Sequence, residues 1–201
     1  RHKNRAITLW DYERLILQQF PEIHKVRCLN HTSVTSYLAP GNVMLVVIPD
    51  IQNKNVFDIY QPRLSRAKLN EVQTFINQLN SQHVNTMVIN PEYEEVQLVL
   101  KVKFRSGYDE NYYRKVLQDD LTKILSPWAF ERTVDLQFGT TLHQSIIIQT
   151  IEKLNYVDFF TELKIKHNNE FKTSVAPSGP KSIIVSAKVH DITVLQTGCT
   201  K

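Results

Sequence analysis

Cysteine and glycine are scarce in this chain of 201 residues, and each shortage excludes a class of protein. The two cysteines, Cys28 and Cys199, are far apart in the sequence and neither belongs to a CxxC pair. A disulfide framework or a cysteine-based zinc site is therefore not expected. With only five glycines, the chain has no glycine-rich loop of the kind that cradles phosphate groups.

Long apolar runs and dense runs of one charge are also missing. No apolar segment approaches the roughly 20 residues that a membrane span requires. The chain has 24 Lys+Arg against 20 Asp+Glu, a net charge of +4, without any dense basic run. We therefore expect no membrane span and no specific nucleic-acid binding. Because the sequence begins at Arg1 rather than at Met, we expect it to be the C-terminal fragment of a longer protein.

Residues that could carry chemistry are present, but in no catalytic or metal-binding spacing. None of the seven histidines belongs to an HxH or HExxH motif: His2, His24, His31, His83, His143, His167 and His190. Glu94 and Glu95 should point to opposite faces of a strand, and no serine lies in a G-x-S-x-G context. Cys28 is expected in a strand as a small core residue. We therefore expect no enzyme, no catalytic residue, no metal and no cofactor.

Apolar periodicity predicts four helices and six main strands. The helices are expected at residues 7–20, 65–79, 110–124 and 142–154, and Thr8, Ser65 and Asp109 are placed to cap the first three. The strands are expected at residues 23–29, 43–48, 84–89, 96–104, 157–165 and 183–189. Residues 43–48 are nearly all apolar, which indicates a strand buried on both faces. Residues 96–104 alternate between apolar and polar, which indicates burial on one face.

This order of elements, αββαβ followed by βα(β)αββ, predicts an α+β fold. We expect two small α/β-sandwich lobes of ferredoxin-like, split βαβ character, with helices packed on mixed or antiparallel sheets. The first lobe should span residues 1–90 and the second residues 91–201. The alternative is one continuous sheet with all helices on one side.

The segment of residues 125–166, which is rich in aromatic residues, should connect two helices and a sheet in the second half of the sequence. Pro127 should end the preceding helix, and residues 127–130 should form a buried packing clasp. Phe138 and Gly139 should close a short strand, with Gly139 permitting a sharp turn. Large aromatic residues either seal the ends of a core or anchor a protein–protein interface. The candidates for such a structural motif or interface are Trp10, Tyr93, Pro127, Trp128, Phe130, Phe138, Gly139 and Tyr156.

A series of motifs, in this order, resembles the C-terminal part of baseplate J-like proteins. The motifs lie at residues 8–14, 20–23, 25–29, 39–43, 47–50, 90–96, 126–130, 138–139 and 156–158. Proteins of this family build the wedges of baseplates in contractile-tailed phages and in related contractile injection particles. The resemblance covers most of the chain, and the matching positions are structural.

The resemblance implies a structural, non-enzymatic part that acts through protein–protein assembly. Its partners would be other wedge subunits, hub proteins and sheath proteins. The particle would assemble in the bacterial cytoplasm as a phage tail or a phage-tail-like injection particle. An alternative from another class is a regulatory α+β module that binds a small molecule between its lobes, and a buried polar cluster at the lobe boundary would favour it. An enzyme is the third interpretation.

Overall fold

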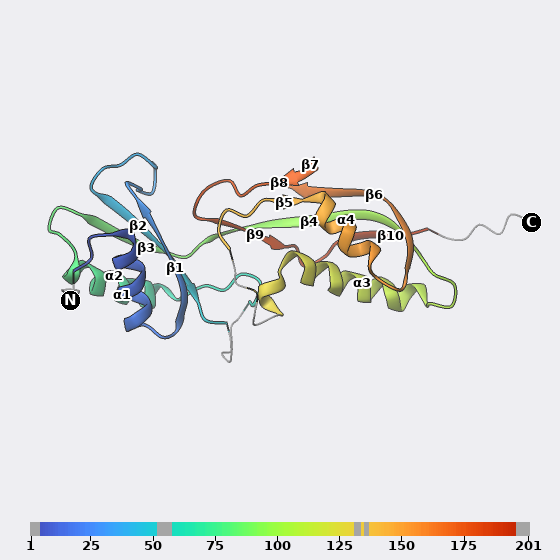
Figure 1. The fold of residues 1–201 in the computed structure, drawn as a ribbon, viewed down its shortest axis with the longest axis horizontal. Coiled ribbons are helices and arrows are strands. Elements are labelled where there is room, and N and C mark those ends of the chain that lie inside the picture. Colours follow the sequence, from blue (N-terminus) through green and yellow to red (C-terminus); the bar gives the residue numbers. More distant parts are fainter. Residues whose placement is uncertain (1–4, 52–57, 131–133, 135–136, 196–201) are drawn as a thin grey trace, which may run out of the picture. The chain divides into compact units, whose positions relative to one another are not determined.

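The computed structural model describes residues 5–51, 58–130, 134 and 137–195 (Figure 1). Cys199 lies outside the described residues. Two compact units make up the chain, a first unit of Arg1–Glu92 and a second unit of Tyr93–Lys201. Helices and strands occur in both units, and the sheets are mixed or antiparallel, which confirms the α+β class.

In the first unit, two helices accompany a three-stranded sheet. Its elements are α1 (Leu9–Gln19), β1 (Ile23–Asn30), β2 (Asn42–Pro49), α2 (Arg66–Leu79) and β3 (Asn85–Ile89). The strand order is β1-β2-β3, with β1 antiparallel to β2 and β2 parallel to β3. Because β2 and β3 are direct neighbours, α2 connects adjacent strands. This connection differs from the predicted split βαβ unit, which would place another strand between them.

Both helices of the first unit begin at the caps that the sequence predicted. The Thr8 side chain accepts a hydrogen bond from the Asp11 backbone N–H, and the Asp11 carboxylate accepts one from the Thr8 backbone N–H. Ser65 caps α2 in the same way, through the Lys68 N–H. Each cap satisfies donors that a helix cannot pair internally. The helices then bury Ile16 and Ile76 in one core with the sheet.

Strand β2 is buried along almost its whole length, as its apolar sequence predicted. Alternate side chains, among them Leu45 and Val47, face the core that α1 and α2 share. The side chains between them, Met44, Val46 and Ile48, are also buried. Burial on both faces explains why this strand has no alternation of apolar and polar residues.

The second unit contains a longer strand, β4 (Glu92–Phe104), at the centre of a larger sheet. The other elements are α3 (Glu110–Leu125), the 3₁₀ helix η1 (Pro127–Ala129), β5 (Leu142–His143), α4 (Gln144–Glu152), β6 (Val157–His167), β7 (Glu170–Lys172), β8 (Ser174–Val175), β9 (Ser182–Ser186) and β10 (Asp191–Val194). The main sheet has the order β10-β4-β6-β7, with β9 also paired to β4, while β5 and β8 form a separate pair. Strand β6 is antiparallel to β4 and β10 is parallel to it.

Helices α3 and α4 share one core with a single face of this sheet (Figure 1). Strand β4 contributes every second residue to that core: Val96, Leu98, Leu100, Val102 and Phe104. Leu117 and Leu121 of α3 and Ile147 and Ile151 of α4 complete its fully buried centre. The alternation predicted for this strand is therefore confirmed, and the intervening residues point to the opposite face.

The strand predicted at residues 183–189 is wrong in its second half. β9 ends at Ser186, and a separate strand, β10, begins at Asp191. Between them the Ala187 N–H donates to the Val96 carbonyl, and the Leu98 N–H donates to Nδ1 of His190 rather than to a backbone carbonyl. An imidazole thus replaces one rung of the ladder, which sequence periodicity cannot reveal.

Three smaller predictions in the second unit need correction. The helix expected from residue 142 begins at Gln144, because Leu142 and His143 pair with β8. The segment 168–181, expected to be a loop, contains β7 and β8. Phe138 and Gly139 lie in a turn rather than at a strand end, and Gly139 has the positive φ of +74° that suits a sharp turn. Residues 135–136, expected in the same strand, lie outside the described residues.

Candidate functional site

The face of the second sheet opposite α3 and α4 carries a concentration of lysine and phenylalanine side chains. We call it the outer face, defined by the outward residues of four strands: Glu95, Gln97, Val99, Lys101 and Lys103 of β4, Phe159, Thr161, Lys164 and Lys166 of β6, Phe171 of β7, and Asp191 and Thr193 of β10. Strand pairing sets these side chains beside one another, with Lys103 opposite Phe159 and Lys166 opposite Phe171.

Two lysines of the outer face lie over exposed phenylalanine rings. Nζ of Lys103 is 5.7 Å from the centroid of Phe159, and Nζ of Lys164 is 5.5 Å from that of Phe171. Both distances are within the range of a cation–π attraction. The rings themselves are 46% and 58% exposed, which is unusual for phenylalanine. The outer face therefore offers apolar and cationic groups together.

A third lysine, Lys101, is paired within the face. Its Nζ lies 2.7 Å from Oε1 of Glu162, and this hydrogen bond with Lys101 lowers the pKa of Glu162. Glu162 has a positive φ of +53° at a point where β6 holds an extra residue relative to β4. Such a bulge turns a side chain that would otherwise follow the strand alternation, and here it brings the carboxylate to Lys101.

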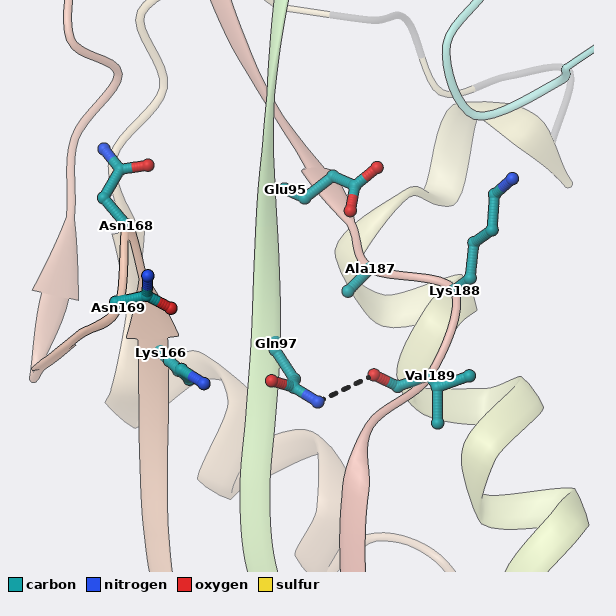
Figure 2. A pocket seen from close by; sticks show the side chains of 8 residues that line it. All are labelled: Glu95, Gln97, Lys166, Asn168, Asn169, Ala187, Lys188 and Val189. Atoms are coloured by element: carbon teal, nitrogen blue, oxygen red, sulfur yellow. Dashed lines mark hydrogen bonds between the residues drawn. The ribbon is translucent and has the colours of Figure 1, made fainter.

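An open pocket of about 440 Å³ lies at one end of the outer face (Figure 2). Glu95 and Gln97 come from β4, Lys166 from β6, Asn168 and Asn169 from the turn after it, and Ala187, Lys188 and Val189 from the connection between β9 and β10. Gln97 lies between the two sides and donates from Nε2 to the Val189 carbonyl, at 3.2 Å. Most of the polar groups come from residues far apart in the sequence.

One wall of the pocket is fixed by a tight turn and a buried polar cluster. Asn168 and Asn169 both have positive φ, 50° and 64°, and join β6 to β7 as a two-residue hairpin. Beneath them, Nε2 of buried His167 lies 2.9 Å from Oε2 of Glu94. Burial raises the pKa of Glu94, but the nearby Ser182 hydroxyl and the hydrogen bonds from Ser178 and His167 outweigh it and lower the pKa overall.

The opposite wall is held by His190, which is buried. Its Nδ1 accepts from the Leu98 N–H at 3.2 Å, and its Nε2 lies 3.2 Å from Oγ of Ser186. Since the Ser186 hydroxyl donates to the Ala187 carbonyl, Nε2 of His190 is the donor in the second contact. Burial lowers the pKa of His190 to about 4, so the ring is neutral at pH 7. Residues 187–190 are thereby kept in a fixed path beside β4.

The aromatic residues proposed from the sequence occupy different environments. Trp10 lies on α1, 49% exposed, with the Arg14 guanidinium 4.7 Å from its ring centroid. Pro127 begins η1 directly after α3, as predicted. Trp128 is half-buried beside an apolar pocket of about 260 Å³, and Phe130 is 43% exposed. The prediction that both rings of residues 127–130 are buried is therefore wrong for Phe130.

Two further candidates, Tyr156 and Tyr93, lie in the second unit. The buried Tyr156 hydroxyl donates to Oδ2 of Asp120 at 2.7 Å, and burial together with this hydrogen bond raises the pKa of Tyr156. Its ring packs against Phe104 and Tyr113. Tyr93 lies half-buried in β4. Among the described residues of the second unit, the structure does not bring these candidates together into one site, and Trp10 belongs to the first unit.

Groups capable of nucleophilic or metal chemistry are poorly placed for it. Burial, aided by the charge of Glu13, raises the pKa of Cys28 to about 12, so its thiol stays protonated near pH 7. Among the described residues, no three His, Cys, Asp or Glu side chains lie close enough to hold a metal ion. Within the same part of the chain, no helix has both the length and the apolar character of a membrane span.

The outer face was not found from the sequence. Its only local signal is the lysine at every second position of β4 and β6: Lys101 and Lys103, then Lys164 and Lys166. That pattern alone is typical of any half-exposed strand. Pairing of strands that are distant in the sequence was needed to show that these lysines share one face with two phenylalanines.

The fold and the outer face define an α+β protein suited to binding other proteins. One solved structure, the 6-fold symmetrised baseplate of the anti-feeding prophage, matches with a TM-score of 0.69 and 23% sequence identity. The match covers 92% of this chain and 38% of the matched chain. This likeness establishes a shared fold. A search of curated proteins gives no significant match.

A family model described as baseplate protein PVC11-like matches residues 1–186. The chain belongs to this family of baseplate proteins. The sequence-based prediction of a baseplate protein is thereby confirmed. The narrower assignment to J-like wedge proteins stays a prediction.

Proposed function

We propose that this chain is a structural part of a contractile injection particle and acts by protein assembly rather than catalysis. The observation that carries the proposal is the outer face, where Phe159 and Phe171 are exposed among lysines on a rigid sheet. Exposed aromatic residues beside cations are typical of surfaces that bind other proteins. Membership of a baseplate family supports the same conclusion.

The finer assignment is a wedge subunit whose neighbours are other wedge subunits, hub proteins and sheath proteins. The fold shared with a baseplate chain of the anti-feeding prophage supports it. Because the present chain spans only 38% of that protein, the function of the whole protein is part of the proposal. Assembly would take place in the bacterial cytoplasm before the particle is released.

We further propose that the two units act as separate lobes, each with its own contact surface. In the first unit the exposed apolar residues Leu9, Trp10 and Leu17 lie on α1. Trp10, Arg14 and Leu17 follow one another at positions i, i+4 and i+7, so these three lie along one stripe of the helix surface. Trp10 and Arg14 are residue types that often dominate binding energy at interfaces. This helix surface would contact a second neighbour in the baseplate.

The chemistry of one buried pair in the second unit supports a role without catalysis. The strongest candidate for acid–base chemistry is the pair of His167 and Glu94, since both are largely buried and 2.9 Å apart. Both oxygens of Glu94 already accept hydrogen bonds, including two from Ser178. The Ser178 hydroxyl donates to the carboxylate rather than to the imidazole, so it is not activated as a nucleophile.

Deletion of the gene in a particle-producing strain, followed by complementation, tests the proposal. We expect the deletion strain to yield no complete particles by electron microscopy, and the complemented strain to carry the protein in purified particles at a fixed ratio to the other subunits. Complete, contracting particles from the deletion strain would contradict a structural role. A small-molecule module would instead leave particle yield unchanged and bind a metabolite in native mass spectrometry.

A further inference from the structure

We propose that the outer face docks an acidic surface of another protein in the particle, with a partner carboxylate bound beside Lys166 in the pocket. This inference rests on the proposed assembly role and names the chemistry of the partner. Its starting observation is the convergence of five lysines from three separate segments: Lys101, Lys103, Lys164, Lys166 and Lys188.

The charge of the outer face is positive and largely unpaired. Against those five lysines stand Glu95, Glu162 and Asp191, an excess of two positive charges. Glu162 pairs with Lys101. No carboxylate of the described residues forms an ion pair with Lys103, Lys164, Lys166 or Lys188. A surface with unpaired cations attracts a partner of opposite charge and speeds its association.

The two phenylalanines give this electrostatic surface apolar contact area. Phe159 and Phe171 project from β6 and β7, and each ring has a lysine ammonium within 6 Å. Excluding water from the rings on docking would strengthen the attraction between those ammonium groups and partner carboxylates, because the local dielectric falls. The strands hold these side chains in place before binding, which reduces the entropy lost on association.

The pocket gives the proposed partner a specific point of contact. Lys166 of β6 and Lys188 of the β9–β10 connection line its two sides, with Gln97 between them, and the Lys188 amine points away from Gln97 (Figure 2). The amides of Asn168 and Asn169 add hydrogen-bond donors at the rim. The buried histidines His167 and His190 hold the backbone of the two walls in place. The Lys166 ammonium and the amide donors suit a partner carboxylate, which would bind on their side of the pocket rather than beside Glu95.

The same features favour an acidic protein over a nucleic acid. The outer face contains no arginine, and Glu95 and Asp191 lie among its lysines. Those carboxylates would repel a continuous phosphate backbone, whereas a protein surface can place its own cations opposite them. The exposed strands also alternate charge with phenylalanine, a pattern that a protein surface of mixed composition can match.

The decisive experiment compares two doubly charge-reversed variants of the full-length protein in the complemented deletion strain. Lys164→Glu with Lys166→Glu alters the outer face, while Arg114→Glu with Lys115→Glu makes the same charge change on α3. All four residues lack an ion pair with the described residues, and both positions on α3 are exposed. The amount of protein in purified particles is measured by quantitative mass spectrometry. We expect the outer-face variant to fall by at least about tenfold and the α3 variant to change by less than about twofold.

Three further measurements keep the result interpretable. Circular dichroism melts of both purified variants verify folding, and Lys164→Gln with Lys166→Gln should give an intermediate loss because it removes charge without reversing it. Wild-type protein should dissociate from particles as NaCl rises from 0.15 to 1 M, since screening shortens the Debye length from about 8 Å to about 3 Å.

Equal incorporation of a folded outer-face variant and the wild type would overturn the docking proposal. Loss of binding to a 30-base-pair DNA duplex, with incorporation into particles unchanged, would also overturn it and assign the face to nucleic acid. In both cases wild-type protein still enters particles, so the assembly role stands. Failure of the wild-type protein itself to enter particles would instead contradict the proposed function.

Discussion

The central strands of the two units are covered differently. Strand β2 of the first unit is buried on both faces, whereas β4 of the second unit is buried on the face toward α3 and α4 and partly exposed on the other. Their sequences reflect the difference, since β2 reads Val-Met-Leu-Val-Val-Ile at residues 43–48 and β4 places lysine at 101 and 103.

The contrast separates residues that hold the fold from residues that are available for binding. In β2 a polar substitution on either face would enter a core. In β4 only one face has that constraint, so the other can carry lysines without loss of stability. A strand that is half covered can therefore serve assembly and stability at once, through alternate residues.

The largest expected effect comes from placing a charge on the corresponding faces of the two strands. Val46→Asp puts a carboxylate into a fully buried position, and we expect it to lower the free energy of unfolding by more than about 3 kcal/mol. Val99→Asp, on the outer face between Lys164 and Asp191, should lower it by about 1 kcal/mol, because attraction to one neighbour offsets repulsion from the other. Urea denaturation of both variants measures the difference. Similar losses from the two variants would show that the strands are covered alike.

A second test compares two aromatic side chains that follow α3, half-buried Trp128 and exposed Phe130. Trp128→Ala should lower the free energy of unfolding by about 2 kcal/mol, because half of a large ring is removed from apolar surroundings. Phe130→Ala should change it by less than about 0.5 kcal/mol, because that ring is exposed. Circular dichroism during urea denaturation reports both. A larger loss for Phe130→Ala than for Trp128→Ala would reverse our assignment of the two rings.

A third test uses pH to probe the connection between β9 and β10. The pKa of His190 is lowered to about 4 in the folded protein, against roughly 6.5 when unfolded. The unfolded chain therefore binds the extra proton first, and stability falls as the pH drops from about 6.5 toward 4. We expect a loss on the order of 2 kcal/mol between pH 8 and pH 5 in the second unit. It can be followed by Trp128 fluorescence in a Trp10→Phe background.

The control for that test is His190→Gln, which cannot take up a proton. Its second unit should lose less than about 0.5 kcal/mol over the same pH range. The lowered pKa of Glu94 acts in a separate window, because its stabilisation is lost only as the pH falls below about 4.5. An NMR titration midpoint of His190 near 6.5 in the folded protein would contradict the assigned environment.

The smallest expected effect is on the outer face itself. Glu162→Gln breaks the exposed contact with Lys101, and we expect no resolvable change in the urea midpoint of unfolding, because an exposed ion pair adds little to stability. The same variant leaves Lys101 unpaired and should tighten retention in particles at 0.15 M NaCl. A clear fall of the urea midpoint would place this ion pair among the residues that hold the fold.

Much of the local structure could be predicted because its causes lie within a few residues. The capping box at Thr8, the N-cap at Asp109, the alternation of β4 and the stop at Pro127 each depend on neighbours in sequence. The family resemblance also came from short motifs, and the family match confirms it at the level of a baseplate protein.

The candidate site was less predictable, since its residues are joined only by strand pairing. The aromatic residues singled out from the sequence proved to be scattered, and Phe130 is exposed rather than buried. Nothing near Lys166 in the sequence indicates that Lys188 shares its pocket. Lys166 and Lys188 line the same pocket because β6 and the β9–β10 connection both run beside β4.

The sequence by itself determined most of the helices and main strands and which face of each is apolar, because capping and side-chain periodicity are local. Only the tertiary structure decided that β4 and β6 pair with a bulge at Glu162, and that His190 completes a ladder which a backbone carbonyl would usually complete. These features depend on hydrogen bonds between residues 60 to 92 positions apart, where packing of the whole unit selects one register among several that the local sequence allows.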